Sequence, residues 1–409
     1  MLDILKVTLI FIVILLFLRL KWNIGYVMLA ASGLQALLYL MPIRVILSTI
    51  KSAVFDPVTI KLFFALTLIR VLEIVLREKQ VLAKMTEASR NLLKRKRATI
   101  ISMPMLIGLL PSLGGAYFSA PMVDEATKDL KMSPEEKGFI NYWFRHPWEF
   151  ILPLYPGILL ASAITKLELR SLILSNALYA LLLIITGFMF SMQHIESRRP
   201  AVVSQEPEDR CNKNRIGTEW RLLFSFLPVT VVMVLVMVLR IELHYSLGIT
   251  ILILYVFFRF TPKEVFRTLK YGFTLDVVIL IFGTMLFKFT MENSGAVRHL
   301  SQYFAEREIP ILPVLFILPF ISGILTGLTV GFVGSTFPLI ISIAGAAHLS
   351  QLSFAFASGY AGVLLSPVHL CLILTRDYFK ADIWGIYKKI IPACLIIMVG
   401  ALLEHLLFG

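Results

Sequence analysis

Long apolar blocks constrain the fold of this chain more than any other sequence feature. They run for roughly 17–25 residues, which is the length that a helix needs to cross the hydrocarbon core of a bilayer. Residues 171–190 and 222–239 are clear examples, and only Asn176 noticeably interrupts the first of them. A buried helix of a soluble protein is usually shorter and carries a polar stripe. Because 58% of all residues are hydrophobic, we expect an all-α polytopic membrane protein.

The positive charge and the cysteines bear on several other protein classes. A net charge of +13 is compatible with nucleic-acid binding, but no RNA- or DNA-binding motif is visible. Basic residues also hold the loops of membrane proteins in the cytoplasm, so we expect no nucleic-acid partner. Cys211, Cys371 and Cys394 are far apart and odd in number, which predicts neither a zinc site nor a structural disulfide.

Motifs for chemistry on bound nucleotides or peptides are absent from the sequence. It contains no phosphate-binding loop of the Walker type, no zinc-protease motif and no hydrolase nucleophile elbow. We therefore expect a protein that is not an enzyme and that carries no cofactor. Transport by such a chain would draw on an ion gradient rather than on ATP.

About ten membrane helices and two hairpins account for the apolar blocks. We expect helices at about 2–19, 22–41, 57–76, 140–164, 171–190, 222–239, 245–259, 273–290, 351–374 and 390–408. The first block lacks a basic start and a cleavage site, which favours a retained helix over a signal peptide. Residues 99–120 and 311–347 are rich in Gly and Pro, and we expect each to form a re-entrant hairpin that enters and leaves the membrane on one side.

The distribution of Lys and Arg predicts the orientation of these helices. We assign the basic run 77–97, which ends in four consecutive basic residues, to the cytoplasm. Alternating the helices then places 191–221, 259–270 and 376–389 on the same side, together with most of the 39 Lys and Arg residues. This bias is the one that the positive-inside rule requires. We expect a multi-pass protein of the cytoplasmic membrane with both termini outside.

The same topology divides the chain into two similar halves of opposite orientation. Each half has three helices, a hairpin, a long Pro- or Gly-rich broken helix and a closing helix. The halves are residues 1–190 (hairpin 99–120, broken helix 140–164) and residues 220–409 (hairpin 311–347, broken helix 351–374), joined by the cytoplasmic linker 191–219. Inverted repeats of this kind are common in secondary transporters.

The two hairpins contain candidate binding residues. Irregular backbone at membrane depth is tolerated only where protein buries it or a cavity hydrates it, and Gly and Pro should break the helix at 111–121 and 327–338. The predicted site residues are Ser112, Gly114, Gly115, Ser119, Thr329, Gly334, Ser335 and Thr336. The candidates for sodium coordination among them are Ser112, Gly115, Ser335 and Thr336. Close helix packing through small residues is the alternative interpretation.

The two broken helices contain the second set of candidates. The predicted site residues are Asn141, Arg145, His146 and Glu149 in the first and Ser358, Gly359 and Ser366 in the second. Three prolines should unwind the first helix near its charges, and charges in a membrane segment are normally paired or functional. Arg145 can hold an anion by its planar fork, and Glu149 and His146 can carry a proton. The alternatives are that Arg145 only pairs with Glu149, and that His369 is an ordinary core histidine.

These candidate residues are compatible with three functions. The first is an ion-coupled secondary transporter of a small organic anion such as a carboxylate, with sodium or a proton as the coupling ion. The second is a sodium/proton antiporter in which Glu149 and Asp124 carry protons. The third is a membrane-embedded enzyme or lipid-handling protein that uses Ser366, His369 or His146.

Two stretches resemble a known family. The run from Pro111 to Asp124, Pro-Ser-Leu-Gly-Gly-Ala-Tyr-Phe-Ser-Ala-Pro-Met-Val-Asp, and the run from Asn141 to Glu149, Asn-Tyr-Trp-Phe-Arg-His-Pro-Trp-Glu, are similar to the prokaryotic membrane family called domain of unknown function 401. The resemblance runs the full length of the chain. That family is grouped with the ion transporter superfamily, beside gluconate, citrate, dicarboxylate and arsenite permeases and sodium/proton antiporters.

The resemblance implies a scaffold domain and a transport domain, the latter with two opposed hairpins and two broken helices. It also implies a homodimer that moves its transport domain by an elevator motion. The dicarboxylate transporters of the superfamily have Ser-Asn-Thr motifs at the hairpin tips, whereas this chain has no Asn at either tip. The resemblance therefore favours a transporter without favouring one substrate.

Overall fold

The computed structural model describes residues 2–81, 84–85, 96–109, 111, 115–191, 224–344 and 348–408. All regular elements in these ranges are helices, and no strand occurs among them. The expected all-α fold class is therefore confirmed. Nearly all of the predicted linker 191–219 and most of the basic run 77–97 lie outside the described residues.

The helices of the first half follow one another along the chain from residue 2 to residue 191. They are α1 (Leu2–Arg19), α2 (Ile24–Leu38), α3 (Ile43–Phe55), α4 (Pro57–Glu78), α6 (Lys96–Gly108), α7 (Gly115–Ala126), α8 (Pro134–Trp143), α9 (Trp148–Ile151), α10 (Pro156–Thr165) and α11 (Leu169–Ser191).

The helices of the second half begin after the linker. They are η1 (Phe224–Phe226), α13 (Leu227–Met237), α14 (Leu243–Phe257), α15 (Pro262–Gly272), α16 (Leu275–Asn293), α17 (Ala296–Glu306), α18 (Leu312–Thr326), α19 (Thr329–Ala344), α20 (Leu349–Leu364), α21 (Leu370–Phe379) and α22 (Ile383–Phe408).

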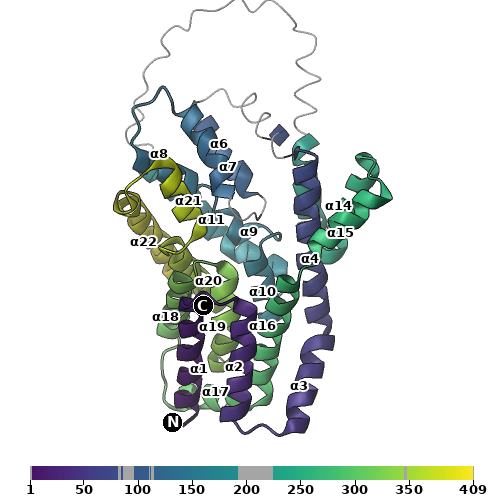
Figure 1. Cartoon of the computed structure of the whole chain (residues 1–409). Coiled ribbons are helices and arrows are strands. Elements are labelled where there is room, and N and C mark those ends of the chain that lie inside the picture. The colour runs from purple at the N-terminus through teal and green to yellow at the C-terminus, as the bar shows by residue number, and fades with distance from the viewer. Residues whose placement is uncertain are drawn as a thin grey trace, which may run out of the picture.

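Two pairs of helices approach the middle of the molecule from opposite ends. In Figure 1, α6 and α7 descend from the upper end, whereas α18 and α19 rise from the lower end. The helices within each pair pack against one another, and the second pair turns at Gly327, which has a positive φ of 60°. The chain begins at the lower end of this view and finishes near its middle (Figure 1). Both predicted hairpin segments thus consist of two packed helices.

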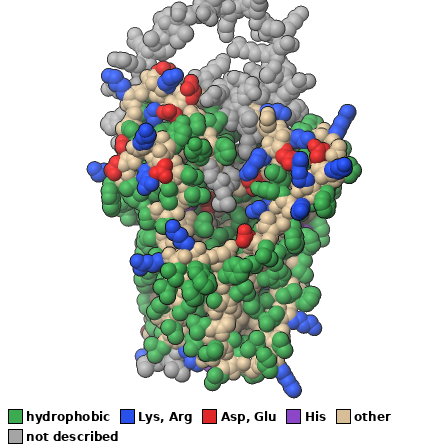
Figure 2. Space-filling model, in the orientation of Figure 1, with side chains coloured by type: hydrophobic (Ala, Val, Ile, Leu, Met, Phe, Trp, Pro, Cys, Tyr) green, Lys and Arg blue, Asp and Glu red, His purple; other side chains and the backbone are tan. Residues whose placement is uncertain are grey.

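Apolar surface dominates the molecule, as expected for a protein embedded in a membrane. On the face shown in Figure 2, hydrophobic side chains cover most of the lower part, and charged side chains gather at the upper end. Among the described residues, three helical segments are long and apolar enough to cross a bilayer, Pro134–Thr165, Leu169–Ser191 and Ile383–Phe408, and a fourth is obtained if α15 and α16 form one bent span. Several shorter apolar helices accompany them.

Three helices of the structure were not expected from the sequence. They are α3, α15 and α17, and each has an apolar face and a polar face. Their charged residues lower the average hydrophobicity of any long window, so a search for apolar blocks passes over them. An amphipathic helix of this kind is suited to the interface between lipid and water.

The irregular backbone in the two hairpins is shorter than predicted. Helix α7 begins at Gly115 and continues through Pro121, and α19 begins at Thr329 and continues through Pro338. The expected break at 327–338 is therefore limited to Gly327 and Leu328. The physical reason is that a proline removes a single N–H, and keeping the remaining peptide groups hydrogen bonded in the helix avoids the cost of exposing them to lipid.

Glycines set how closely several helices approach. A Cβ atom built on Gly323 of α18 would lie 2.2 Å from the carbonyl oxygen of Gly359 in α20, and one on Gly362 would lie 2.2 Å from that of Phe320. Helices α2 and α16 meet in the same way, because a Cβ on Gly283 would lie 2.2 Å from the Gly25 carbonyl oxygen. Small residues are the usual means of close packing between membrane helices.

Candidate functional site

Breaks in three helical segments meet at the centre of the molecule. The first broken helix is interrupted at 144–147 and at 152–155, and the second is interrupted at 365–369. Proline cannot donate a backbone hydrogen bond and forces the preceding residue into an extended conformation, as observed at Leu152 and Tyr155. The turn of α18 and α19 at Gly327 reaches the same place, since a Cβ on Gly327 would lie 2.9 Å from the His369 nitrogen.

Arg145 lies in the first of these breaks and is buried, with 5% of its surface exposed. Its NH1 group is 3.5 Å from the hydroxyl oxygen of Ser119, and its Nε has no hydrogen-bond partner. Within the described part of the chain, no carboxylate forms an ion pair with it, although Glu149 is four residues away. The described contacts thus do not include the direct Arg145–Glu149 ion pair of the alternative interpretation.

Glu149 contacts the opposite half of the chain instead. Its carboxylate accepts a hydrogen bond from the hydroxyl of Thr329, the first residue of α19. Gly157 allows this approach, because a Cβ atom there would lie 2.5 Å from the Thr329 methyl carbon. The contact joins α9 to the turn between α18 and α19.

Asn141 connects three helices around the same centre. Its side-chain nitrogen donates to the Ala116 carbonyl of α7 at 3.1 Å and to the Thr375 hydroxyl of α21 at 2.9 Å. Its side-chain oxygen accepts from Ser119 at 2.6 Å. Gly115, the first residue of α7, is buried beside them. The structure therefore brings Gly115, Ser119, Asn141 and Arg145 together.

His146 and His369 face one another across the two broken helices. Their Nε2 atoms are 3.1 Å apart. The Nδ1 atom of His146 is 2.6 Å from the Tyr142 carbonyl oxygen, and that of His369 is 2.6 Å from the Gly327 carbonyl oxygen. Among the described residues, these two rings and the Cys371 thiol are a group whose donor atoms, all within 4.8 Å of one another, could hold a metal ion.

Ser335 and Thr336 of α19 and Ser358 of α20 each bond to a carbonyl of their own helix. Ser335 bonds to the Gly331 carbonyl at 2.7 Å and to the Ser322 hydroxyl at 2.7 Å, and Thr336 donates to the Phe332 carbonyl at 2.6 Å. Ser358 donates to its own helix in the same manner, at 2.8 Å from the Phe354 carbonyl oxygen.

The glycines and the remaining serine of this set have other positions. A Cβ atom built on Gly334 would lie 3.4 Å from the Thr284 hydroxyl oxygen, and Gly359 packs against the ring of Phe332. Ser366, in the break of the second broken helix, donates to the Ile324 carbonyl at 2.6 Å. Ser112 and Gly114 lie outside the described residues.

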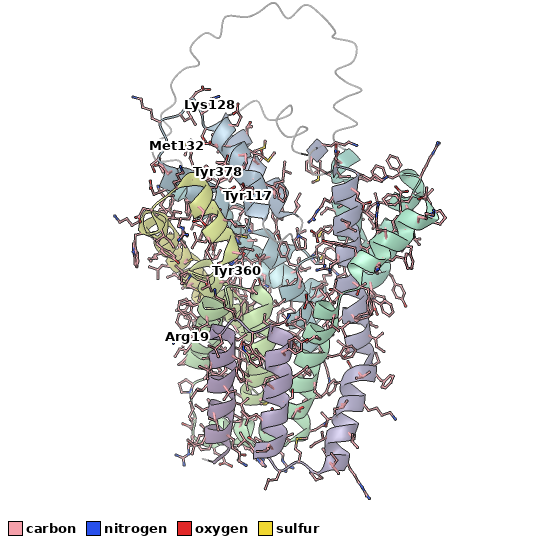
Figure 3. The ribbon with its side chains drawn as sticks, viewed as in Figure 1. Arg19, Tyr117, Lys128, Met132, Tyr360 and Tyr378 are labelled. Atoms are coloured by element: carbon pink, nitrogen blue, oxygen red, sulfur yellow. The ribbon has the colours of Figure 1, made fainter. Side chains whose placement is uncertain are left out.

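Three tyrosines that the sequence analysis did not single out satisfy carbonyls freed at the breaks. Tyr142 donates to the Leu364 carbonyl at 3.0 Å, and Tyr360, which lies near the middle of Figure 3, donates to the His146 carbonyl at 3.0 Å. Tyr155 donates to the Gly108 carbonyl at 2.5 Å. Unwound backbone at membrane depth needs such partners. The feature of the sequence that could have indicated this role is the presence of a tyrosine within an apolar block.

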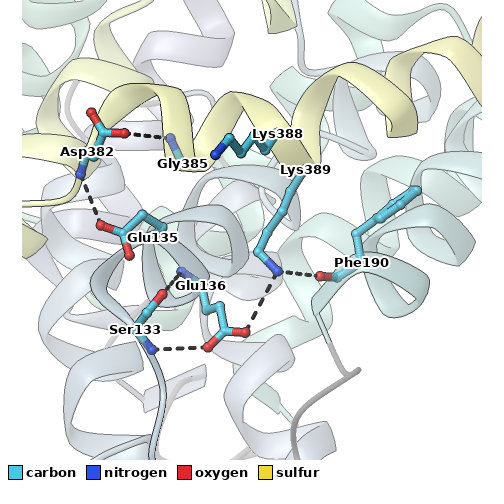
Figure 4. A pocket seen from close by; sticks show the side chains of 8 residues that line it. All are labelled: Ser133, Glu135, Glu136, Phe190, Asp382, Gly385, Lys388 and Lys389. Carbon is cyan, nitrogen blue, oxygen red and sulfur yellow. Dashed lines mark hydrogen bonds and ion pairs between the residues drawn. The ribbon is translucent and has the colours of Figure 1, made fainter.

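A separate polar hollow lies at the upper end, away from the breaks. Figure 4 shows the residues that line it, most of them at the start of α8 and of α22. The hollow has a volume of about 560 Å³. Lys389 lies 3.8 Å from the Glu136 carboxylate and donates to the Phe190 carbonyl at 3.0 Å, while Glu135 accepts from the Asp382 N–H at 3.2 Å. These bonds join helices from both halves, and Lys388 completes the rim.

One family model covers nearly the whole chain. It carries the description "Protein of unknown function (DUF401)" and matches residues 3–408. No curated protein matches the sequence.

Proposed function

The chain belongs to the DUF401 family of proteins of unknown function, and from the site described above we propose that it is an ion-coupled secondary transporter of a small organic anion such as a carboxylate. The cargo would bind where the helix breaks meet, between the tips of the two helix pairs. Sodium or a proton would be the coupling ion, and the protein would act without a cofactor and not as an enzyme.

The buried guanidinium of Arg145 carries this proposal. Arg145 has no direct ion-pair partner among the described residues, and a charge at membrane depth without one is costly, so such a charge normally serves a charged ligand or ion. The fork of an arginine matches the two oxygens of a carboxylate, and Arg145 has an unused Nε donor. The neighbouring side chains of Ser119 and Asn141 are neutral, so they do not compete with an anion for the Arg145 guanidinium.

Corresponding helices of the two halves make corresponding contacts, which supports the predicted inverted repeat. Helix α2 packs on α16 as α14 packs on α4, and α3 packs on α16 as α15 packs on α4. In the same way, α8 packs on α22 and α20 packs on α11. Such reciprocal contacts between the halves are expected when two like units are related by a twofold axis in the membrane plane.

The coupling ion is better matched by Glu149 than by the predicted sodium ligands. Ser335 and Thr336 carry neutral hydroxyls that donate to carbonyls of α19, and neither can take up and release a proton in a transport cycle. Glu149 lies at the centre and accepts a hydrogen bond from the Thr329 hydroxyl. A carboxyl group there can bind and release one proton per cycle, which favours proton coupling.

The antiporter alternative is weakened by the position of Asp124. Its side chain is 49% exposed and pairs with Lys137 at 2.7 Å, near the upper end of α7. This is the surface ion pair expected at the mouth of a site, and it leaves Glu149 as the single carboxylate of the proposed pair at the centre.

The resemblance to dimeric transport families supports a homodimer. We place it in the cytoplasmic membrane, with the lipid bilayer and the small-molecule cargo as its partners and both termini outside.

Uptake into proteoliposomes tests the function. The purified chain is reconstituted and offered a panel of labelled mono- and dicarboxylates under an imposed sodium or proton gradient. We expect gradient-driven uptake of at least one carboxylate, and Arg145→Ala should weaken its apparent affinity about 10- to 100-fold through loss of charge-assisted hydrogen bonds.

Arg70→Ala is the matched control, because Arg70 also has an Nε without a partner but stacks on Tyr271 in a different part of the fold. Uptake of no carboxylate under either gradient, or unchanged affinity in Arg145→Ala, would count against the proposal.

A further inference from the structure

Two imidazole rings from helix breaks 223 positions apart in sequence are directed at one another in the core. His146 lies in the break between α8 and α9, and His369 directly precedes α21. Both residues are buried, with 2% and 6% of their surface exposed. The transport proposal rests on Arg145 and does not use this pair.

The hydrogen bonds of the two rings fix where their protons lie. A carbonyl oxygen can only accept, so each ring must donate from Nδ1, His146 to Tyr142 and His369 to Gly327. In a neutral imidazole the other nitrogen then carries a lone pair. The two Nε2 atoms would therefore present two acceptors to each other at 3.1 Å. That contact is repulsive unless a positive ion lies between the lone pairs.

A third donor atom completes the arrangement. The thiol of Cys371, in the first turn of α21, lies within 4.8 Å of both rings. Two imidazoles and a thiolate are the ligands that zinc and related ions prefer. In a tetrahedral zinc site, Zn–N bonds of about 2.0–2.1 Å place two ligand nitrogens about 3.3 Å apart. The observed separation of 3.1 Å is close to this value.

The outer contacts of the histidines have the form found around bound metals. A ligating histidine almost always donates its remaining N–H to a carbonyl or carboxylate, which fixes the ring and its tautomer. Both His146 and His369 do so, at 2.6 Å in each case. An ordinary buried histidine needs hydrogen-bond partners for its own ring. It does not need a second imidazole ring directed at its free nitrogen.

We propose that His146, His369 and Cys371 bind a thiophilic transition-metal cation, of which Zn²⁺ is the common example. The ion would join the break of the first broken helix to that of the second. The segment that carries His369 reaches the surface, because Val368 and Leu370 are 43% and 42% exposed. Three protein ligands leave the fourth tetrahedral position to water or an anion. Spacing along the chain did not indicate this site, since its ligands come from opposite halves.

Cobalt titration tests the site on the full-length protein in detergent. The purified chain is stripped with a chelator and titrated with Co²⁺, whose visible spectrum reports tetrahedral geometry and whose near-ultraviolet charge-transfer band reports a thiolate ligand. We expect both signals to saturate at one equivalent and to be removed by added Zn²⁺.

Substitution of the ligands identifies them. Cys371→Ser should remove the charge-transfer band, and His146→Gln or His369→Gln should lower the affinity by more than about 100-fold, because even changes outside the ligand shell cost about 10–100-fold. The matched controls are Cys394→Ser, a buried thiol on α22, and His405→Gln, whose ring stacks on Phe354. Both should titrate as the wild type does.

Two results would overturn the proposal without requiring any variant to fold. One is a wild-type protein that gives no saturable cobalt spectrum. The other is a spectrum without a thiolate band. In the first case the two rings would instead share a proton, which a titration of their NMR signals would detect as a single ionisation common to both. Neither result would affect the uptake experiment on Arg145.

Discussion

Glu149 illustrates how a single side chain connects the structure to coupling. It accepts a hydrogen bond from Thr329 across the two halves, so its charge influences whether the first broken helix stays docked on α19. A carboxylate accepts this bond in full, whereas protonation leaves a weaker acceptor. Proton binding and release at Glu149 would therefore be linked to the contact between the halves.

We predict that Glu149→Gln uncouples transport from the proton gradient. The amide is neutral at every pH and still accepts the Thr329 hydrogen bond, so the fold should be retained. Gradient-driven net uptake should fall to the level seen without a gradient, while exchange of internal for external substrate continues. Parallel measurements of net uptake and exchange in proteoliposomes check this.

Glu404→Gln is the control for that prediction. Glu404 is a carboxylate on the apolar helix α22 and accepts a hydrogen bond from Tyr179 at 2.7 Å. It has the same type of partner as Glu149 but lies outside the centre, so both activities should be unchanged. Proton-driven uptake that survives in Glu149→Gln would show that another group carries the proton.

The sequence identified the charged members of the site but not their partners. Arg145, His146 and Glu149 are conspicuous because charges beside prolines are rare in apolar segments. Cys371 gave no such signal, since a cysteine is an ordinary residue of a membrane helix, and Tyr360 was marked only as a tyrosine within an apolar block. Their roles depend on contacts between halves that lie more than two hundred residues apart, and spacing within one segment cannot reveal such contacts.

At the scale of elements, Gly and Pro located the breaks but not their lengths. Pro147, Pro153 and Pro156 mark the interruptions of the first broken helix correctly. Pro121 and Pro338 lie within continuous helices. The difference is that the first three are clustered, so three N–H donors are lost within ten residues, whereas an isolated proline removes one bond that the rest of the helix tolerates.

The glycine contact between α18 and α20 gives a testable prediction for this scale. Gly323→Ala would place a Cβ 2.2 Å from the Gly359 carbonyl oxygen, so the helices must move apart. We expect a loss of about 1–3 kcal/mol of stability, as for overpacking elsewhere. The measurement is the thermal unfolding midpoint in detergent.

Gly248→Ala is the matched control, because this glycine lies within helix α14 and a Cβ there would meet no atom within 4 Å. Alanine is the better helix former by about 0.5–1 kcal/mol, so the midpoint should stay the same or rise. A Gly323→Ala protein as stable as Gly248→Ala would contradict the close packing of α18 and α20.

At the scale of the whole molecule, charge and fold agree about which loops share a side. The sequence assigned 259–270 and 376–389 to the cytoplasm, and the structure places these segments toward the upper end of Figure 1. Lys128 and Met132, both labelled in Figure 3, mark this end. Agreement arises because the positive-inside bias is a property of whole loops and does not depend on exact helix boundaries.

Cysteine labelling from the two sides of the membrane tests this orientation. Lys128→Cys and Lys263→Cys place exposed thiols at the upper end, and Lys51→Cys and Arg307→Cys place them on α3 and next to α17. The background is Cys211→Ser. A membrane-impermeant maleimide should label the first pair in inside-out vesicles and the second pair in right-side-out vesicles.

The two ways in which this labelling can fail have different meanings. If both pairs react but in the opposite vesicles, the fold stands and the assignment of the basic loops to the cytoplasm is wrong. If Lys128→Cys and Lys51→Cys react from the same side, the ends of the molecule do not face opposite compartments. The helix pairs α6–α7 and α18–α19 then cannot enter from opposite sides, and a site reached alternately from each side is excluded. The labelling thus tests the geometric requirement that any transport by this fold must meet.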